Sequence, residues 1–348
     1  MDIKPIKAEN IKRLLIRSTN WIGDAVMTTP AVRSVRHNFP CAHISILVKP
    51  WVRPVFENSA HVDSVLTYDG AGEHKGFGGK FRLAKALRKY RFDAVILLQN
   101  AFEAALITFL AGIPVRIGYN TDGRRLLLTH PIRCRPEFKN AHQTGYYLNI
   151  IKGAGLERGE PELYLVTSSQ QRARARELLF AHGVTEESRL VGINPSATYG
   201  PAKQWPLARY AGLADKIQKY AGCRILVFGG PEDRELGRRM SRMMQRPPVD
   251  LAGKTELGEA MALIEQCSLF VTNDSGLMHV AAALNVPVVA VFGSTNAKTT
   301  GPFGSASRIV QVPLPCNPCL KPECPEGHLS CMEQIDVDMV FDAAKELL

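Results

Sequence analysis

A polar segment between two apolar runs carries the strongest chemical signal in this sequence. Residues 272–279 read Thr-Asn-Asp-Ser-Gly-Leu-Met-His, with apolar residues at 267–271 before them and a helix-like stretch, 280–284, and a second apolar run, 286–292, after them. This order predicts strand, loop, helix and strand. In parallel α/β sheets ligands bind where strands end, and a helix beginning at Ser275 would direct free N–H groups and its positive dipole end at the loop. We therefore expect a phosphorylated ligand there.

Asp24 is a candidate general base. It ends the segment Asn20-Trp21-Ile22-Gly23-Asp24, directly after a predicted strand at 12–17. A carboxylate at the carboxyl end of a strand can accept a proton from a substrate hydroxyl. Asp24 could instead cap the helix that it opens, which is a common use of aspartate. The spacing leaves both interpretations open.

Two further polar loops also follow predicted strands. The loop Asn194–Pro206 offers hydroxyls and Lys203, which could neutralise a departing diphosphate or could simply be solvated. In the loop 229–233, Glu232 could accept hydrogen bonds from a ribose or cap the next helix. His279, on the first turn after Ser275, could donate to a phosphate oxygen or make a structural hydrogen bond.

Two other groups of residues could hold a metal. Four cysteines spaced C-x2-C-x4-C-x6-C, with His328 nearby, are consistent with a zinc site or with a reduced, packed loop, since disulfides are disfavoured in a cytosolic chain. They are Cys316, Cys319, Cys324 and Cys331. The pair Asp336 and Asp338 could bind a divalent cation, but it opens an amphipathic helix, so capping is the favoured interpretation.

The charge of the chain is unevenly divided. Residues 1–160 hold 24 Lys and Arg against 13 Asp and Glu, whereas residues 161–348 hold 19 against 20. A basic half favours a polyanionic partner, such as an anionic lipid surface or a phosphorylated glycan, or it is only a solubilising surface. Nucleic acid is disfavoured because no recognised binding motif occurs. With no secretory signal and no long apolar run, the sequence predicts a cytoplasmic protein.

Alternating strands and helices predict two doubly wound parallel sheets. The first set comprises strands at 12–17, 43–48, 64–67, 93–98 and 115–118, helices at 24–37, 81–90 and 102–110, and a glycine-rich loop at 70–79. The second set comprises helices at 170–182, 207–220, 234–245, 258–266 and 339–348, and strands at 190–194, 224–228 and the two apolar runs around 272–279. We expect an α/β fold with Rossmann-like domains at 1–165 and 166–348 and a cleft between them.

Together these motifs resemble the bacterial ADP-heptose:lipopolysaccharide heptosyltransferases of glycosyltransferase family 9. The resemblance spans nearly the whole chain. Residues 199–206 and the cysteine segment point to heptosyltransferase II, which adds the second inner-core heptose. The motifs that carry the resemblance are Ser18–Asp24 with Thr28–Ala31, Asn194–Pro206, and Asn273–His279 with Phe292–Thr295.

The resemblance implies an inverting enzyme of Gram-negative bacteria with GT-B architecture. It would move heptose from ADP-heptose to heptosyl-Kdo2-lipid A without a metal or other cofactor, with the acceptor on the N-terminal domain and the donor on the C-terminal domain. Asp24 matches the catalytic aspartate and Lys203 the phosphate-contacting lysine. The implied donor-binding residues are Thr198, Tyr199, Lys203, Glu232, Asp274, Ser275, Gly276, Leu277 and His279.

The basic N-terminal half agrees with an anionic acceptor at the inner face of the inner membrane. The candidate basic residues are Arg53, Lys80, Arg82, Lys85, Arg88, Arg124 and Arg125. Three alternatives remain open at this point: transfer to another inner-core position, a nucleotide-sugar epimerase of the same architecture, and a non-catalytic glycan- or membrane-binding protein.

Overall fold

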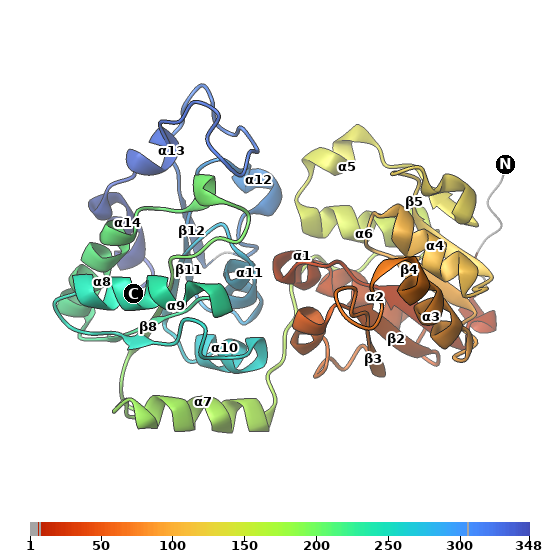
Figure 1. Cartoon of the computed structure of the whole chain (residues 1–348), viewed down its shortest axis with the longest axis horizontal. Coiled ribbons are helices and arrows are strands. Elements are labelled where there is room, and N and C mark those ends of the chain that lie inside the picture. The colour runs from red at the N-terminus through yellow and green to blue at the C-terminus, as the bar shows by residue number, and fades with distance from the viewer. Residues whose placement is uncertain (1–5, 7, 305) are drawn as a thin grey trace. The chain divides into compact units, whose positions relative to one another are not determined.

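The structure is a computed structural model that describes residues 6, 8–304 and 306–348. The chain divides into two compact units, unit 1 over Met1–Val166 and unit 2 over Thr167–Leu348. Each unit holds a six-stranded parallel sheet with helices packed against it (Figure 1).

The sheet of unit 1 has the order β3-β2-β1-β4-β5-β6, and all neighbouring strands are parallel. The direction of winding reverses between β1 and β4, and ligands in such sheets bind beside that switch point, outside the carboxyl ends of the strands. The strands are β1 (Arg13–Arg17), β2 (His43–Val48), β3 (Ser64–Thr67), β4 (Ala94–Leu97), β5 (Val115–Tyr119) and β6 (His130–Ile132).

Helices surround this sheet. Helices α3 and α4 pack against each other and share a core cluster with Leu15 and Val95, while α2 packs against α6. The helices are η1 (Ala8–Asn10), α1 (Ile22–Met27), α2 (Thr29–Asn38), η2 (Pro50–Val55), α3 (Gly76–Arg88), α4 (Phe102–Leu110), η3 (Arg124–Leu127), α5 (Pro136–Asn140) and α6 (Gln143–Gly153).

Unit 2 repeats the same winding. Its sheet order is β12-β11-β10-β7-β8-β9, so the switch point lies between β7 and β10. The strands are β7 (Leu190–Asn194), β8 (Arg224–Val227), β9 (Val249–Asp250), β10 (Leu269–Asn273), β11 (Val288–Val291) and β12 (Ser307–Val310). The helices are α7 (Ser169–Ala181), η4 (Pro201–Lys203), α8 (Leu207–Ala221), η5 (Pro231–Asp233), α9 (Arg234–Met243), α10 (Leu257–Ile264), α11 (Gly276–Ala283), α12 (Ala297–Thr300), α13 (Ser330–Glu333) and α14 (Val337–Lys345).

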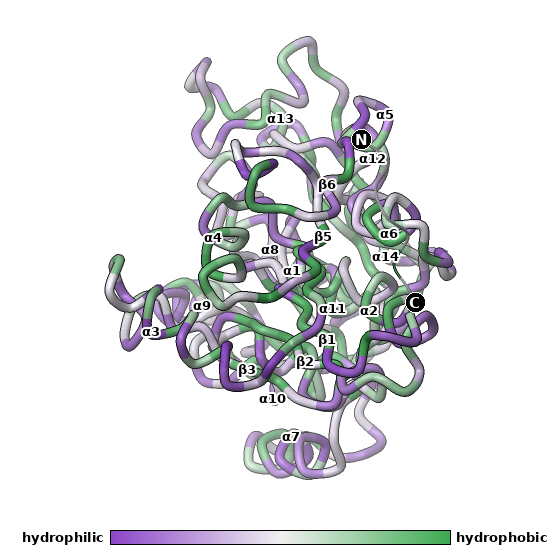
Figure 2. Tube along the Cα trace, turned by 90° about the vertical axis from the view of Figure 1, so that its right-hand side faces the viewer, coloured by the Kyte–Doolittle hydropathy of each residue, from purple (hydrophilic) through white to green (hydrophobic). Residues whose placement is uncertain are grey.

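The predicted α/β fold with two doubly wound parallel sheets is confirmed. Strands β4, β7, β10 and β11 are buried along their whole length, as expected for parallel strands covered on both faces. Figure 2 shows hydrophobic, green stretches along strands and hydrophilic, purple stretches on helices such as α3 and α7.

Two predicted segments differ from the structure. The helix expected over 24–37 is two helices, because Thr28 and Thr29 bond their hydroxyls back to Ala25 O (2.6 Å) and Val26 O (2.8 Å) and Pro30 cannot continue the N–H ladder. The loop expected over 70–79 is helical from Gly76. There Gly79 lies against the backbone of His74, where a Cβ would come within 2.3 Å of the carbonyl carbon, so that glycine allows the close approach.

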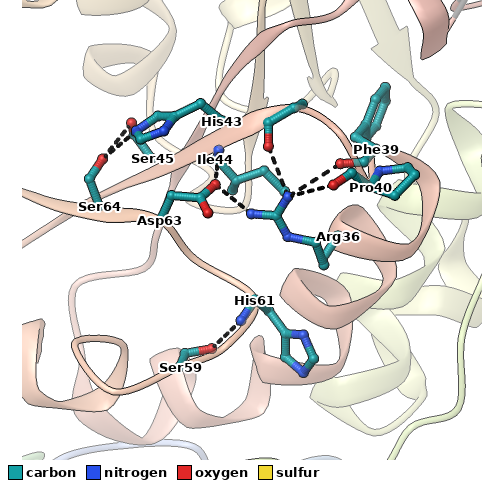
Figure 3. Close-up of polar contacts among 11 residues, drawn as sticks. Arg36, Phe39, Pro40, His43, Ile44, Ser45, Ser59, His61, Asp63 and Ser64 are labelled. Carbon is teal, nitrogen blue, oxygen red and sulfur yellow. Dashed lines mark hydrogen bonds and ion pairs between the residues drawn. The ribbon is translucent and has the colours of Figure 1, made fainter.

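A charged cluster holds the amino ends of β2 and β3 together (Figure 3). Arg36, from the last turn of α2, pairs with Asp63 Oδ2 at 2.5 Å and donates to the carbonyl of Ala42 at 2.8 Å. The same Asp63 oxygen accepts from the backbone N–H of Ile44 at 2.6 Å. This cluster lies at the edge of the sheet opposite to the carboxyl ends of the strands, so it stabilises the fold and leaves the ligand-binding edge to other residues.

Candidate functional site

Asp24 lies on the first turn of α1, just beyond the carboxyl end of β1 and therefore beside the switch point of unit 1. The N-cap position of this helix belongs to Trp21, and Asp24 is the third helical residue. Its carboxylate is partly exposed. The hydroxyl of Tyr147 donates a hydrogen bond to Asp24 Oδ1 at 3.3 Å.

Tyr147 comes from α6, a helix that was not among the elements predicted from the sequence. Burial raises the pKa of the Tyr147 phenol well above its ordinary value, and the negative charge of Asp24 raises it further. The phenol therefore stays protonated and remains a donor to the carboxylate across the physiological range. This contact fixes the orientation of the Asp24 carboxylate at its Oδ1 atom.

The loop between β1 and α1 is held in place by two side chains from elsewhere in unit 1. Arg17 donates to Asn20 Oδ1 at 2.9 Å, and the Trp51 indole N–H donates to the carbonyl of Asn20 at 2.8 Å. Arg17 is buried, which lowers its pKa to about 10, and its guanidinium also donates to the carbonyls of Ser18 at 2.5 Å and Leu47 at 3.3 Å. Because Asp24 follows this loop within four residues, a rigid loop backbone also holds Asp24 in position.

In unit 2 the amino end of α11 points toward the switch point between β7 and β10. Ser275 caps the helix, with its hydroxyl accepting from the N–H of Met278 at 3.3 Å. Asn194, at the end of β7, donates to the Ser275 hydroxyl at 3.0 Å, and Thr272 contacts it at 2.9 Å. This network ties the two strand ends together and leaves the N–H groups of Gly276 and Leu277, both partly exposed, at the positive end of the helix.

Lys203 and Asp274 form an ion pair at this edge. The Lys203 Nζ to Asp274 Oδ2 distance is 2.5 Å, and the side chains are 14% and 6% exposed. The hydroxyl of Thr295 donates to the same carboxylate oxygen at 2.7 Å, and the ammonium stands 4.7 Å from the Tyr199 ring centroid. The structure thus joins three predicted donor-site residues, Lys203, Asp274 and Tyr199, and adds Thr295, which belongs to the motif Phe292–Thr295 but was not among the predicted donor-binding residues.

Asn273 and Tyr199 make hydrogen bonds that hold the loops around the ion pair in place. Asn273 accepts from the backbone N–H of Trp205 at 3.1 Å and from the Tyr210 hydroxyl at 2.9 Å, so it anchors the loop that carries Lys203. Tyr199 is half exposed and donates to the carbonyl of Leu320 at 3.0 Å, while Thr198 is exposed. The exposed atoms of these two residues are free to meet a ligand beside the ion pair.

Glu232 and His279 differ sharply in exposure. Glu232 is exposed in η5, where its neighbour Asp233 organises the turn by accepting from Ser196 Oγ at 2.7 Å and Gly230 N at 2.7 Å. Asp233 therefore stabilises the turn, and the exposed Glu232 side chain is available to contact a ligand. The His279 side chain on α11 is only 3% exposed. A phosphate can contact its ring only if the ligand lies directly against the amino end of α11.

The cysteine segment packs behind the Lys203 loop. Cys316, Cys319, Cys324 and Cys331 all line one cavity of about 20 Å³ together with His328, and all eight cysteines of the chain are free. Backbone N–H groups, first that of Leu329, lower the pKa of the Cys324 thiol. Within the part of the chain that the structure describes, no three or more His, Cys, Asp or Glu side chains are grouped to hold a metal.

Backbone hydrogen bonds connect this segment to the donor-side loops. The N–H of Ala202 donates to Pro322 O at 3.0 Å, and the N–H of Leu320 donates to Ser294 O at 2.8 Å. The segment therefore supports the residues on either side of the Lys203–Asp274 pair. The predicted cap of the last helix is confirmed, because Asp336 Oδ1 accepts from Met339 N at 2.8 Å; Asp338 instead pairs with Lys216.

The basic residues predicted to meet an anionic acceptor have different surroundings. The prediction is wrong for Arg124, which is fully buried and donates to Tyr119 O at 2.8 Å and to Gln99 O and Asn100 Oδ1 at 2.5 Å each. Its guanidinium closes a loop inside unit 1 and cannot reach a ligand. Lys80 pairs with Glu103 at 2.6 Å. The exposed ones are Arg53, Arg82, Lys85, Arg88 and Arg125.

Comparison with known proteins adds a family to this geometry. Residues 80–330 match the model of glycosyltransferase family 9 (heptosyltransferase). The chain is 29% identical to lipopolysaccharide heptosyltransferase 2 of Escherichia coli (strain K12), over 97% of this chain and 98% of that protein, and 30% identical to that of Salmonella typhimurium, with the same coverage. The solved structure of E. coli ADP-heptose LPS heptosyltransferase II matches with a TM-score of 0.81, 27% identity, and 96% and 98% coverage of the two chains.

The matches to the two relatives and to the solved structure run almost from end to end and include both sheets, so the fold has the GT-B composition of two Rossmann-like units. They also favour sugar transfer over the epimerase and over a non-catalytic binding protein. The chain is therefore an enzyme that belongs to glycosyltransferase family 9, the heptosyltransferases.

Proposed function

We propose that this glycosyltransferase moves L-glycero-D-manno-heptose from ADP-heptose to the inner core of lipopolysaccharide, adding the second heptose to heptosyl-Kdo2-lipid A. The proposal is supported by relatives named heptosyltransferase 2 that align over nearly their whole length. The observation that carries it is the Lys203–Asp274 pair at the amino end of α11, a combination of one cation and one helix end that suits a diphosphate.

Unit 2 takes the donor in this proposal. The N–H groups at Gly276 and Leu277 and the Lys203 ammonium would hold the two phosphates and stabilise the charge that develops as ADP leaves. Ser275, Asp274 and His279 would form the wall of this site, with Thr198 and Tyr199 at its exposed side. Glu232, exposed in η5 after β8, would accept hydrogen bonds from the ribose.

Unit 1 takes the acceptor, and Asp24 is the general base. Its carboxylate would remove the proton from an acceptor hydroxyl as that oxygen attacks the anomeric carbon of the donor. Attack from the face opposite to the leaving diphosphate inverts the anomeric centre. Tyr147 donates to Oδ1 of this carboxylate and would hold it in position for the proton transfer.

An anionic membrane surface is the second proposed partner. In unit 1 the outer side of α3 carries Phe77 and Phe81, which are 71% and 52% exposed, beside Arg82, Lys85 and Arg88. We call these five residues the α3 face. Exposed aromatic rings among basic side chains suit a peripheral contact with anionic lipid. The part of the chain that the structure describes contains no helix with the length and hydropathy of a membrane span.

The test is incubation of the protein with ADP-heptose and a one-heptose acceptor, with products followed by mass spectrometry. We expect the acceptor to gain one heptose and ADP to be released in equal amount. Asp24→Asn should lower turnover by about two to four powers of ten while ADP still binds, as loss of a general base usually does. Release of free heptose without a glycosylated product, or normal turnover of Asp24→Asn, would contradict the proposal.

A further inference from the structure

Two of the three tryptophans of the chain are exposed, and both lie at the loop that precedes Asp24. Trp21 is 64% exposed and Trp51 is 50% exposed, whereas Trp205 is buried. Trp21 is the N-cap residue of α1, three positions before Asp24, so the two side chains leave the same turn of helix. Trp51 comes from η2, which packs against α1, and its N–H is bonded to the carbonyl of Asn20.

Exposed indoles call for an explanation, because large apolar side chains on a surface mark interaction sites when they gather. The hydrogen bond from Trp51 satisfies the polar atom of that indole within the protein. What remains accessible is the electron-rich ring, which attracts groups of partial positive charge. The C–H groups on one face of a pyranose ring are such groups, so these indoles suit a saccharide.

A cluster of cations lies beside the tryptophans at the carboxyl ends of β1 and β2. The Lys49 Nζ stands 6.0 Å from the Trp51 ring centroid and 3.7 Å from that of Tyr68, and the Arg17 Cζ stands 5.3 Å from the Tyr68 centroid. Within the described residues neither Lys49 nor Arg17 forms an ion pair with a carboxylate. Burial, and then the nearby charge of Arg17, lowers the pKa of Lys49.

Two carboxylates, Asp69 and Glu103, lie close to this cluster, and both are already engaged. Asp69 Oδ1 accepts from the backbone N–H groups of Ala71 at 3.2 Å and Gly72 at 2.9 Å. Glu103 pairs with Lys80 at 2.6 Å and accepts a hydrogen bond from the Tyr68 hydroxyl. The cluster of Arg17, Lys49 and Lys80 therefore keeps a net positive charge next to the loop that leads to Asp24. Two like charges held close together are unfavourable until an anion joins them, so the missing partner is an anionic group of the ligand.

We propose that Trp21, Trp51 and Lys49 form the acceptor subsite of unit 1, in which the two indoles stack on sugar rings and the Lys49 ammonium binds an acidic substituent of the neighbouring sugar. The proposal rests on the function proposed above and adds the chemistry that selects the acceptor: a saccharide with a carboxylate or phosphate within reach of the hydroxyl that is glycosylated. Arg17 acts as a positioning residue, since it fixes Asn20 and repels Lys49 toward the ligand.

The kinetic test uses a delipidated one-heptose acceptor, so that contact with lipid plays no part. Trp21→Ala, Trp51→Ala and Lys49→Met should each raise the KM for this acceptor about tenfold, the value of one good aromatic or charged contact, with the KM for ADP-heptose unchanged. Trp51→Phe, which keeps an aromatic ring but loses the N–H bond and part of the ring surface, should raise the KM less than Trp51→Ala does. Phe180→Ala, which removes an exposed aromatic ring from α7 of unit 2, is the matched control.

Two modified acceptors identify the anion. If Lys49 binds a carboxylate, reducing the carboxyl group of the acceptor should raise the acceptor KM of the wild type about tenfold and should not raise that of Lys49→Met any further. If Lys49 binds a phosphate, removing the phosphate from the acceptor should have this effect instead. If each modified acceptor raised the acceptor KM equally in the wild type and in Lys49→Met, the proposed contact between Lys49 and an anion would be overturned. An unchanged acceptor KM in Trp21→Ala and Trp51→Ala, or the same rise in Phe180→Ala, would overturn the stacking part.

A binding measurement keeps this inference separate from the proposed activity. Tryptophan emission of the wild type should shift to shorter wavelength when the delipidated acceptor is added without donor, because the two exposed indoles become covered. A shift with no heptose transfer would refute the proposed reaction and leave the subsite standing. No shift with this acceptor, together with a shift on vesicles of phosphatidylglycerol, would instead make the indoles membrane anchors and overturn the subsite.

Discussion

The Lys203 ammonium lies 2.5 Å from Asp274 Oδ2, although the two residues are 71 positions apart in the sequence. They come from the loops after β7 and β10, the two strands that flank the switch point of unit 2. With Thr295 bonded to the same oxygen, the pair fixes the position of one positive charge at the amino end of α11 before any ligand arrives. A preorganised charge of this kind suits the stabilisation of a leaving group.

Lys203→Met should weaken ADP binding by about 10- to 100-fold, the usual loss for a charged hydrogen-bonding partner. The effect has two causes: the cation is lost, and the Asp274 carboxylate that remains would repel the diphosphate. Isothermal titration with ADP measures it. Lys216→Met, which breaks an exposed pair with Asp338 on the outside of the same unit, should bind ADP as the wild type does. Equal affinities of the two variants would remove Lys203 from the donor site.

Tyr147→Phe should lower kcat several-fold and leave both KM values nearly unchanged, since it loosens the orientation of Asp24 without touching a substrate. Because burial and then the charge of Asp24 raise the pKa of Tyr147 well above 10.0, the phenol does not ionise within the working range. The alkaline limb of the rate profile should therefore be the same for wild type and Tyr147→Phe. A limb near pH 10 that disappears in the variant would show that Tyr147 titrates and would contradict this assignment.

The sequence predicted the edge of each sheet at which the candidate site residues lie, because parallel strands buried on both faces appear as apolar runs and the polar residues that follow them stand out. Asp24 after β1, Lys203 after β7 and Asp274 after β10 were all found in this way. Their pairing could not be predicted. Strand order is set by long-range pairing, and nothing in the residues around Lys203 indicates that β10 lies beside β7.

Tyr147 was missed for a different reason. Helix α6 is buried along most of its length, so it lacks the alternation of polar and apolar faces by which surface helices are recognised. It also contains Gly145, which reads as a turn signal. The 123 residues that separate Tyr147 from Asp24 hide their contact from any local pattern.

Acid should destabilise unit 1 partly through Asp63. Burial opposes ionisation of this carboxyl, but hydrogen bonds from the Ile44 N–H and the Arg36 guanidinium outweigh it, and the pKa of Asp63 falls below its ordinary value of 3.8. A lowered folded-state pKa adds stability that is present above 3.8 and is lost as the pH falls through the lower folded value. The urea midpoint of the wild type should therefore exceed that of Asp63→Asn at pH 7, and the gap should narrow toward pH 3.

The control for this effect is Asp342→Asn, which removes an exposed carboxylate paired with Lys345 on α14. An exposed pair of this kind contributes little, so this variant should follow the wild type at both pH values. A gap between wild type and Asp63→Asn that is the same at pH 7 and pH 3 would mean that the Asp63 charge does not contribute and that only the shape of the side chain matters.

The α3 face should bind an anionic membrane through its two exposed aromatic rings. Replacing Phe77 and Phe81 together with serine should reduce sedimentation with phosphatidylglycerol-containing vesicles about tenfold or more, because two exposed rings are lost from a surface that also carries Arg82, Lys85 and Arg88. Transfer to a delipidated acceptor should be unaffected, since the rings lie on the outer side of α3. Phe180→Ser, which removes an even more exposed ring from a helix of unit 2, should sediment like the wild type. Raising the salt concentration should weaken vesicle binding by all three proteins, because salt screens the attraction between the basic side chains and the anionic lipid. Vesicle binding that changes neither with the two serine substitutions nor with salt would contradict a contact through the α3 face.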